Sequence, residues 1–444
     1  MRLVATKPVS IAIAGLLLGI TNLAIWFPGE SGPDSQSQYW QAVTWHLDDW
    51  HPPITVWLWS LFRLVTDGDG PMFCFQVILY WLGFLLIAFT LSRTGRWVAA
   101  WAVLAVALFP SLFTTNIELL NDVGMGVTFL AAFAMVFWWR MQDRKIPTPV
   151  AAIALALLVF GALARVNAVF AVVPLFVYLI RPQWLGKPWR LLAVSIPLAL
   201  ALVPVADLIN HRLLRAEPLH PIRSLQVFDL NGIAFYSHDL TVFGPGTSFT
   251  QDELARCYTP AGWDRAAPWG KCRFFWDRLA VSPDLRELAA SLDARGAMGL
   301  KPNPDLSNRW IAAIVHHPLA YAEHRLLHFG SEIGEGLSMW DSDAAGPKPL
   351  SVALYDLVTA SALWIVMGAG LLVCLTSMRS VRRSASIDAA LALLLSALPY
   401  ASAYLIIGVA SQMRYFFWSL VAIFTAAVIA SAECRSRRSD SALA

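Results

Sequence analysis

Long apolar runs recur along most of the chain, and the polar segments that separate them carry most of the charges. About ten of these runs approach the length of roughly 20 residues that an α-helix needs to cross a bilayer. They lie near residues 9–27, 71–91, 97–113, 119–139, 149–164, 168–180, 191–209, 352–375, 387–409 and 415–433. The pattern predicts an all-α polytopic membrane protein with about ten transmembrane helices.

Two consecutive runs, 149–164 and 168–180, are shorter than the others, and Arg144 and Arg181 bracket the pair. We expect two short helices that meet near Arg165 on the opposite face of the membrane. A single re-entrant hairpin is the alternative.

Basic residues gather in alternate connecting segments, at both termini and around 93–96, 140–145, 181–190 and 379–383. Lys and Arg mark the cytoplasmic side of a membrane protein, so we expect both termini in the cytoplasm. Two long segments, 28–70 and 210–350, then face the outside.

This orientation divides the chain into three parts. Residues 1–209 form an N-terminal transmembrane module, and its first outer loop, 28–70, carries the candidate chemistry. Residues 210–350 form an extracytoplasmic segment, and residues 351–444 supply the last transmembrane helices and a cytoplasmic tail.

The composition supports the membrane assignment, because 57% of the residues are hydrophobic and only 14% are charged. The net charge of +3 is nearly balanced. We therefore expect membrane lipids around the protein and no nucleic acid as a partner.

Two of the five cysteines, Cys257 and Cys272, fall in the outer segment 210–350. An external pair suggests a disulfide, although two unpaired thiols are the alternative. The same segment mixes aromatic and polar residues, which predicts a small subdomain with an aromatic core; direct stacking on a substrate is the alternative. Its stretch 309–329 contains four histidines, and we expect a basic amphipathic helix at the interface rather than a zinc site.

The first outer loop concentrates polar and ionisable residues at the edge of the apolar bundle. Residues 35–50 have the pattern of a helix that lies in the interface and ends at Pro52, and 52–66 fits a second interfacial helix. Asp34 would begin the first of these helices, where capping is its simplest role. Burial near the membrane would raise the pKa of its carboxyl toward that of a useful base.

A second group of polar residues begins or ends apolar runs on the same predicted face. Asp122 begins the run 119–139, where it can cap the helix or line a wet cavity. Arg165 and Arg414 are each explained by ion pairing between helices. A guanidinium also holds a phosphate through paired hydrogen bonds, so both are candidates for binding a lipid-linked phosphate.

Together these residues resemble the membrane-embedded glycosyltransferases of the GT-C fold, in particular bacterial relatives of protein mannosyltransferases and of the lipid A aminoarabinose transferase. The resemblance covers about residues 9–210 and 350–433. It rests on Asp34 with Gln38 four residues later, His51-Pro52-Pro53, Asp122, Arg165-x-Asn167 and Arg414-Tyr415.

The resemblance implies transfer of a sugar from a polyprenyl-phosphate donor to an extracytoplasmic acceptor, a lipid, glycan or protein of the cell envelope. It places the site on the periplasmic or extracellular face of a bacterial inner (plasma) membrane. A carboxylate of the first outer loop would act as general base, and a single displacement would invert the anomeric carbon.

The resemblance also assigns roles to individual residues. The expected catalytic residues are Asp34 and Asp122, and the donor phosphate would bind Arg165 and Arg414. Substrate contacts are expected from Gln38, Asp49, His51, Asn167 and Tyr415. Many members carry two adjacent acids in the first loop, whereas here the adjacent pair is Asp48-Asp49, so the identity of the base stays open.

We expect no required cofactor. A divalent cation is the alternative, held by Asp34, Asp122 and a His or Asp from 46–51. The competing function is a transporter or flippase of lipid-linked sugars. Transport needs polar residues along a path through the membrane, and the middles of the runs are almost entirely apolar, which favours the transferase.

Overall fold

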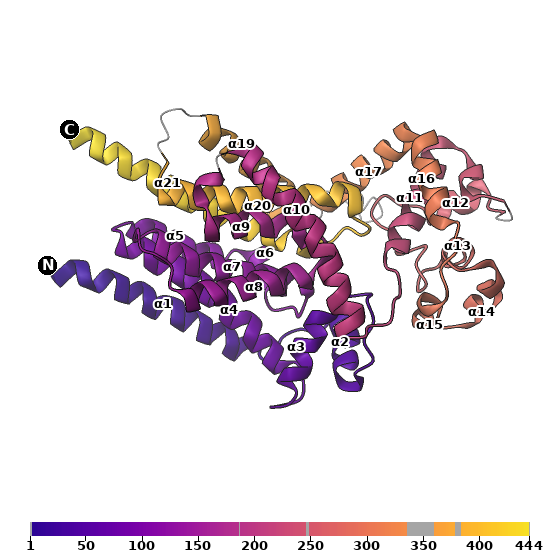
Figure 1. The fold of residues 1–444 in the computed structure, drawn as a ribbon, viewed down its shortest axis with the longest axis horizontal. Coiled ribbons are helices and arrows are strands. Elements are labelled where there is room, and N and C mark those ends of the chain that lie inside the picture. The colour runs from indigo at the N-terminus through magenta and orange to yellow at the C-terminus, as the bar shows by residue number, and fades with distance from the viewer. Residues whose placement is uncertain (1, 186, 246–247, 335–358, 378–382, 444) are drawn as a thin grey trace, which may run out of the picture.

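The protein is a bundle of long helices that carries a group of shorter helices at one end (Figure 1). The computed structural model describes residues 2–185, 187–245, 248–334, 359–377 and 383–443. Within these ranges the regular secondary structure is helical, with a few isolated β-bridges. The start of α1 and the end of α21 lie at the end of the bundle opposite α2 and the shorter helices.

Each predicted apolar run contains a helix of the bundle. The helices are α1 (Arg2–Trp26), α4 (Gly70–Arg93), α5 (Trp97–Ala107), α7 (Asn121–Arg140), α8 (Thr148–Ala164), α9 (Val169–Ile180), α10 (Pro188–Asp207), α19 (Ser361–Ser377), α20 (Ala385–Ile407) and α21 (Phe417–Leu443). The start of the predicted run 352–375 lies outside the described residues.

Among the described residues, six helical stretches are long and apolar enough to cross a membrane. They are Pro8–Trp26, Gly70–Arg93, Asn121–Arg140, Trp189–Leu213, Ala385–Ile407 and Met413–Arg437. The expected all-α membrane class is therefore confirmed. A count of ten spans stays a prediction, because the remaining apolar helices are shorter.

The predicted run 97–113 divides into α5 and a separate helix, α6 (Pro110–Thr115). Pro110 has no amide hydrogen to continue α5 and instead occupies the first turn of α6. After α6 the chain pairs with the segment that follows α1. The Glu30 amide donates to the Ile117 carbonyl, and the Leu119 amide donates to the Glu30 carbonyl. This bridge brings the start of α2 (Pro33–Thr44) close to the start of α7.

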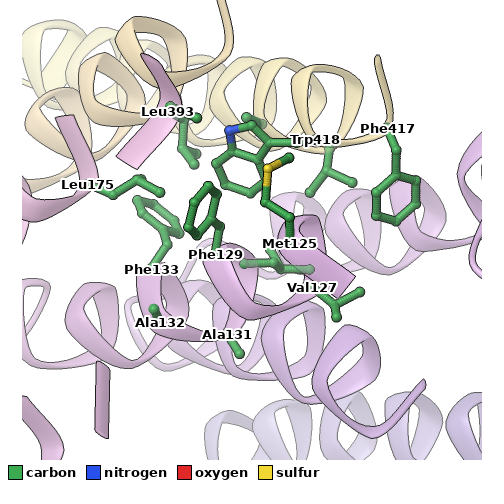
Figure 2. Close-up of a cluster of buried hydrophobic side chains, with 14 of the residues drawn as sticks. Met125, Val127, Phe129, Ala131, Ala132, Phe133, Leu175, Leu393, Phe417 and Trp418 are labelled. Atoms are coloured by element: carbon green, nitrogen blue, oxygen red, sulfur yellow. The ribbon is translucent and has the colours of Figure 1, made fainter. Parts of the chain in front are cut away.

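Part of the core of the bundle forms where α7 packs against α21. Figure 2 shows Phe129 of α7 beside Trp418 of α21, and their ring centroids lie 5.4 Å apart in an edge-to-face arrangement. The buried indole of Trp418 donates to the Ser396 hydroxyl at 2.9 Å. A Cβ at Gly126 would lie 2.7 Å from the Phe417 ring, so the glycine permits the close approach of α7 and α21. This packing sets the start of α21 beside the start of α7.

The first outer loop departs from its prediction. α2 ends at Thr44 instead of continuing to residue 50, and α3 (Pro53–Phe62) follows. Trp45 adopts a left-handed conformation with φ of 56°, and the backbones of Leu47 and Asp49 then pair with Glu217. Those hydrogen bonds cannot coexist with a helix, so 46–51 forms an extended strap that turns back toward the start of α2.

The shorter helices lie between residues 222 and 333. They are α11 (Ile222–Ser237), α12 (Gln251–Cys257), α13 (Phe274–Leu279), α14 (Arg286–Ser291), α15 (Ala294–Gly299), α16 (Leu306–His316) and α17 (Pro318–Ile333). They enclose an apolar core of their own that is rich in aromatic rings, including Phe228, Phe243, Phe249, Phe275 and Trp276. A disulfide joins Cys257 to Cys272 beside this core.

The histidine-rich stretch was expected to form one interfacial helix, and that expectation is wrong. The stretch divides into α16 and α17 around His317, because Pro318 disfavours helical geometry in the residue before it. His324 and His328 are completely buried against α11 instead of facing lipid headgroups.

A buried charge cluster surrounds Asp229 of α11. Its carboxylate forms an ion pair with Arg325, lies 3.1 Å from His324 Nε2 and accepts a hydrogen bond from Trp310 at 2.7 Å. Burial lowers the pKa of His324 to about 4, so the ring is neutral at pH 7, and its Nδ1 lies 2.9 Å from the Tyr258 hydroxyl. Arg325 also donates to the Gly408 carbonyl at 2.6 Å. The cluster thus fastens the shorter helices to the segment that follows α20.

Replacing Asp229 with Ala tests this fastening. The change leaves the Arg325 guanidinium buried without its carboxylate, and breaking a buried pair costs about 3–5 kcal/mol. We expect Asp229→Ala to lower the thermal unfolding temperature of the purified protein by several degrees. Asp252→Ala, at an exposed carboxylate of α12, serves as the control and should have little effect. Equal unfolding temperatures for the two variants would contradict the account.

Candidate active site

A cavity of about 450 Å³ opens at the end of the bundle that carries α2 and the strap 46–51. It receives residues from the starts of α2 and α11, the turn between α8 and α9, the disulfide loop and the segment between α20 and α21. Residues expected at the site that line this cavity are Asp34, Asp49, His51, Arg165, Asn167, Arg414 and Tyr415. Parts of the chain almost 400 residues apart therefore meet at one place.

Two arginine–aspartate ion pairs form the polar floor of the site. Arg414 Nη2 lies 2.8 Å from Asp34 Oδ2, and Arg165 Nε lies 3.0 Å from Asp122 Oδ1. The Asp122 side chain is only 3% exposed, whereas that of Asp34 is 35% exposed. Of these two carboxylates, Asp34 is therefore the one that a molecule in the cavity can reach.

The Tyr415 ring lies beside both guanidinium groups. The Cζ atoms of Arg165 and Arg414 are 5.3 and 5.5 Å from the ring centroid, within the range of cation–π attraction. Tyr404 stacks on Tyr415 with centroids 5.1 Å apart, and its hydroxyl accepts a hydrogen bond from Arg165 at 3.3 Å. One aromatic pair therefore positions two cations at the cavity.

The carboxyl of Asp34 is held ionised. His51 Nε2 lies 3.6 Å from Asp34 Oδ1. Hydrogen bonding to His51 lowers the pKa of the Asp34 carboxyl well below its ordinary value, and the positive charges of His51 and Arg414 act in the same direction. Burial acts in the opposite direction and is outweighed. The expectation that burial would raise the pKa of Asp34 is therefore wrong for this structure.

Asn167 offers a further donor at the cavity. It lies in the 3₁₀ turn η1 (Val166–Ala168), which follows α8 because Arg165 adopts an extended conformation and ends the helix. Asn167 is 95% buried, and its side-chain amide nitrogen has no hydrogen-bond partner in the described part of the chain. An acceptor atom placed in the cavity could satisfy it.

Two expected site residues do not line the cavity. Gln38 is buried in the bundle, and its side-chain nitrogen donates to the Asp34 carbonyl at 3.3 Å. Asp122 lies behind Arg165. Asp49 does line the cavity, but its carboxylate already accepts the Leu219 amide hydrogen at 2.5 Å. The positions of these residues favour supporting roles.

For the aromatic residues of the outer segment the sequence favoured a subdomain core over direct substrate stacking, but two of its tryptophans line the cavity. Trp263 and Trp269 belong to the disulfide loop, and they reach the site because the loop pairs with the segment after α20. The Trp263 amide donates to Val409 at 2.9 Å, and the Ser411 amide donates to Ala261 at 3.0 Å. The signal available in the sequence was the pair of tryptophans between two predicted disulfide cysteines.

The carboxylates of Asp34, Asp49 and Asp122 each face an arginine or a histidine. Among the residues that the structure describes, no three His, Cys, Asp or Glu side chains lie close enough to hold a metal ion. Dependence on a divalent cation stays a question for experiment.

Residues 50–206 match the family model of dolichyl-phosphate-mannose-protein mannosyltransferase. This match confirms the resemblance to GT-C glycosyltransferases. The family is one of glycosyltransferases, so the expected enzyme class is confirmed as well. The matched segment includes His51, Asp122, Arg165 and Asn167. No curated protein and no solved structure gives a significant match to the chain.

Two substitutions of Tyr415 distinguish the role of its aromatic ring from the role of its hydroxyl. Tyr415→Phe keeps the surface beside both guanidinium groups, so the affinity for polyprenyl phosphate should change little. Tyr415→Leu removes it, and the loss of two cation–π contacts of about 0.5–1 kcal/mol each should weaken binding roughly tenfold. Binding to protein in detergent measures both effects, and equal affinity of the Phe and Leu variants would exclude this role.

Proposed function

We propose that the protein transfers a sugar from a polyprenyl-phosphate donor to a hydroxyl or amine of an extracytoplasmic acceptor. The observation that carries the proposal is the arrangement of Arg165 and Arg414 around one tyrosine ring, next to the accessible carboxylate of Asp34. Such a site can hold a phosphate and accept a proton within one cavity. The match to a mannosyltransferase family supports the same reaction class.

In the proposed complex, the donor phosphate binds the guanidinium groups of Arg414 and Arg165. Each arginine already neutralises a carboxylate, so the phosphate must replace at least the exposed Asp34 as the partner of Arg414. The Asn167 amide can add a hydrogen bond to a phosphate or sugar oxygen. The buried Asp122 keeps Arg165 in place.

This exchange of partners prepares Asp34 for catalysis. Once Arg414 holds phosphate, Asp34 loses one of the charges that keep its pKa low and becomes a stronger base. Asp34 then takes the proton of the acceptor while the acceptor oxygen or nitrogen bonds to the anomeric carbon. The bond between that carbon and the phosphate oxygen breaks, and polyprenyl phosphate leaves with the electron pair. Arg414 and Arg165 stabilise its charge, and the single displacement inverts the anomeric carbon.

We place this reaction at the outer face of a bacterial inner membrane. The site lies opposite the end of the bundle that carries the start of α1 and the end of α21 (Figure 1), and the predicted orientation puts those termini in the cytoplasm. A flippase would need a polar path across the membrane. Charged residues of the six long apolar stretches instead lie near their ends, which favours chemistry at one face.

The base assignment predicts that Asp34→Asn abolishes turnover. The substitution keeps the size of the side chain but removes its basicity, so release of polyprenyl phosphate should fall about 10²–10⁴-fold. Donor affinity should be equal or greater, because the carboxylate no longer competes for Arg414. Rates with a panel of polyprenyl-phosphate sugars and extracted envelope acceptors measure the change.

Asp67→Asn is the matched control, since this exposed carboxylate pairs with Arg63 away from the cavity. Its activity should equal that of the wild type. Full activity of Asp34→Asn would refute the assignment and direct attention to Asp122 or the Asp48-Asp49 pair. Adding a chelator to the same assay tests the metal alternative.

The phosphate assignment predicts that Arg414→Ala and Arg165→Ala each weaken donor binding. Hydrogen bonds to a charged partner contribute about 1.5–3 kcal/mol, so the loss should be roughly 10- to 150-fold. Lysine at either position should restore only part of the affinity, because it lacks the planar fork. Arg63→Ala, outside the cavity, should bind normally. Unchanged donor affinity in both Ala variants would contradict the phosphate assignment and show that the two arginines serve only to pair with Asp34 and Asp122.

A further inference from the structure

Three tryptophans form the wall of the cavity contributed by the strap and the disulfide loop. The ring of Trp50 lies 5.9 Å from that of Trp263 and 6.1 Å from that of Trp269, and the last two lie 5.1 Å apart. All three line the same cavity as Asp34 and Arg414. The phosphate and proton-transfer steps described above use none of them.

The positions of these rings are fixed from several sides. Trp50 follows Asp48, whose carboxylate accepts the Trp50 amide hydrogen at 3.1 Å and pairs with Arg295 at 3.0 Å. Trp263 is buried and held by its backbone bond to Val409. Trp269 is 50% exposed, so part of its indole surface is available to a ligand. The aromatic wall is therefore preformed and partly open.

Several polar groups on this wall have no partner in the described part of the chain. None of the three indole N–H groups donates a hydrogen bond to any described residue. The exposed carboxylate of Asp264, next to Trp263, has neither a hydrogen bond nor an ion pair in the same part of the chain. An apolar indole surface beside free donors and a free acceptor suits a pyranose ring, which has an apolar C–H face and hydroxyl groups around its edge.

We infer that Trp50, Trp263, Trp269 and Asp264 form a carbohydrate subsite that binds the sugar of the acceptor. This inference rests on the proposed function. The negative charge of Asp264 disfavours the donor phosphate, which the two arginines attract. A sugar hydroxyl held by the aromatic wall lies in the same cavity as Asp34, where its proton can be removed. The acceptor is thus a glycan or glycolipid rather than an unmodified peptide.

The experiment measures sugar binding separately from phosphate binding. Saturation-transfer NMR on the full chain in detergent uses methyl glycosides of glucose, galactose, mannose and N-acetylglucosamine as probes, and polyprenyl phosphate is titrated independently. The variants are Trp269→Ala, Trp269→Phe and Asp264→Asn. Trp101→Ala is the matched control, because Trp101 is 44% exposed and lies on α5, outside the cavity.

At least one glycoside should bind the wild type and the Trp101→Ala control. Affinity should fall about tenfold or more in Trp269→Ala and Asp264→Asn, and Trp269→Phe should recover part of it. Polyprenyl phosphate should bind the tryptophan variants as it binds the wild type, and Asp264→Asn at least as tightly, because that change removes a negative charge from the cavity. A glycoside that a sugar-charged donor does not displace occupies an acceptor subsite.

Displacement by the sugar-charged donor, but not by polyprenyl phosphate, would assign the aromatic wall to the donor sugar and overturn the acceptor assignment. Absence of glycoside binding, or equal binding by the wild type and Trp269→Ala, would overturn the subsite altogether. Sugar binding that depends on Trp269, without any binding of polyprenyl phosphate, would instead contradict the proposed donor and leave the carbohydrate subsite standing.

Discussion

The pairing of Arg414 with Asp34 and of Arg165 with Asp122 is the constraint on which the site depends. Charges at the end of an apolar bundle are costly unless each finds a partner. Here the partners come from the first turns of α2 and α7, the end of α8 and the turn η6 (Met413–Phe416) that precedes α21. Satisfying both pairs therefore brings these four places together and forms the cavity between them.

The two pairs differ in how far their carboxylates are exposed. Asp122 is buried, so its pair with Arg165 is a fixed part of the structure. Asp34 is partly exposed and also faces His51, so its pair with Arg414 can open when an anion arrives. The buried Asp229 cluster also fixes part of the cavity wall, because Arg325 donates a hydrogen bond to the carbonyl of Gly408, which lines the cavity. The Arg414–Asp34 pair is thus the more exposed of the two and faces the cavity.

Hydrophobic runs predicted the helices of the bundle, because burial in lipid or protein requires apolar residues along each span. The same reasoning placed Asp34, Arg165 and Arg414 on one face, where the structure brings them together. It did not predict the strap 46–51, since the pairing of Leu47 and Asp49 with Glu217 depends on a distant segment. It also took the histidines of α17 for surface groups, because amphipathic periodicity does not reveal that Phe228 and Asp229 of α11 cover that face. Long-range polar contacts were the part that local patterns could not supply.

The most direct test is a cryo-electron microscopy structure of the full chain with polyprenyl phosphate in a lipid nanodisc. The account predicts phosphate oxygens within hydrogen-bonding distance of the guanidinium groups of Arg414 and Arg165, with Arg414 separated from Asp34. A second cavity of about 630 Å³ lies between α5 and α21, around Arg96 and Arg435. Phosphate bound there, with the Arg414–Asp34 pair intact, would contradict the account.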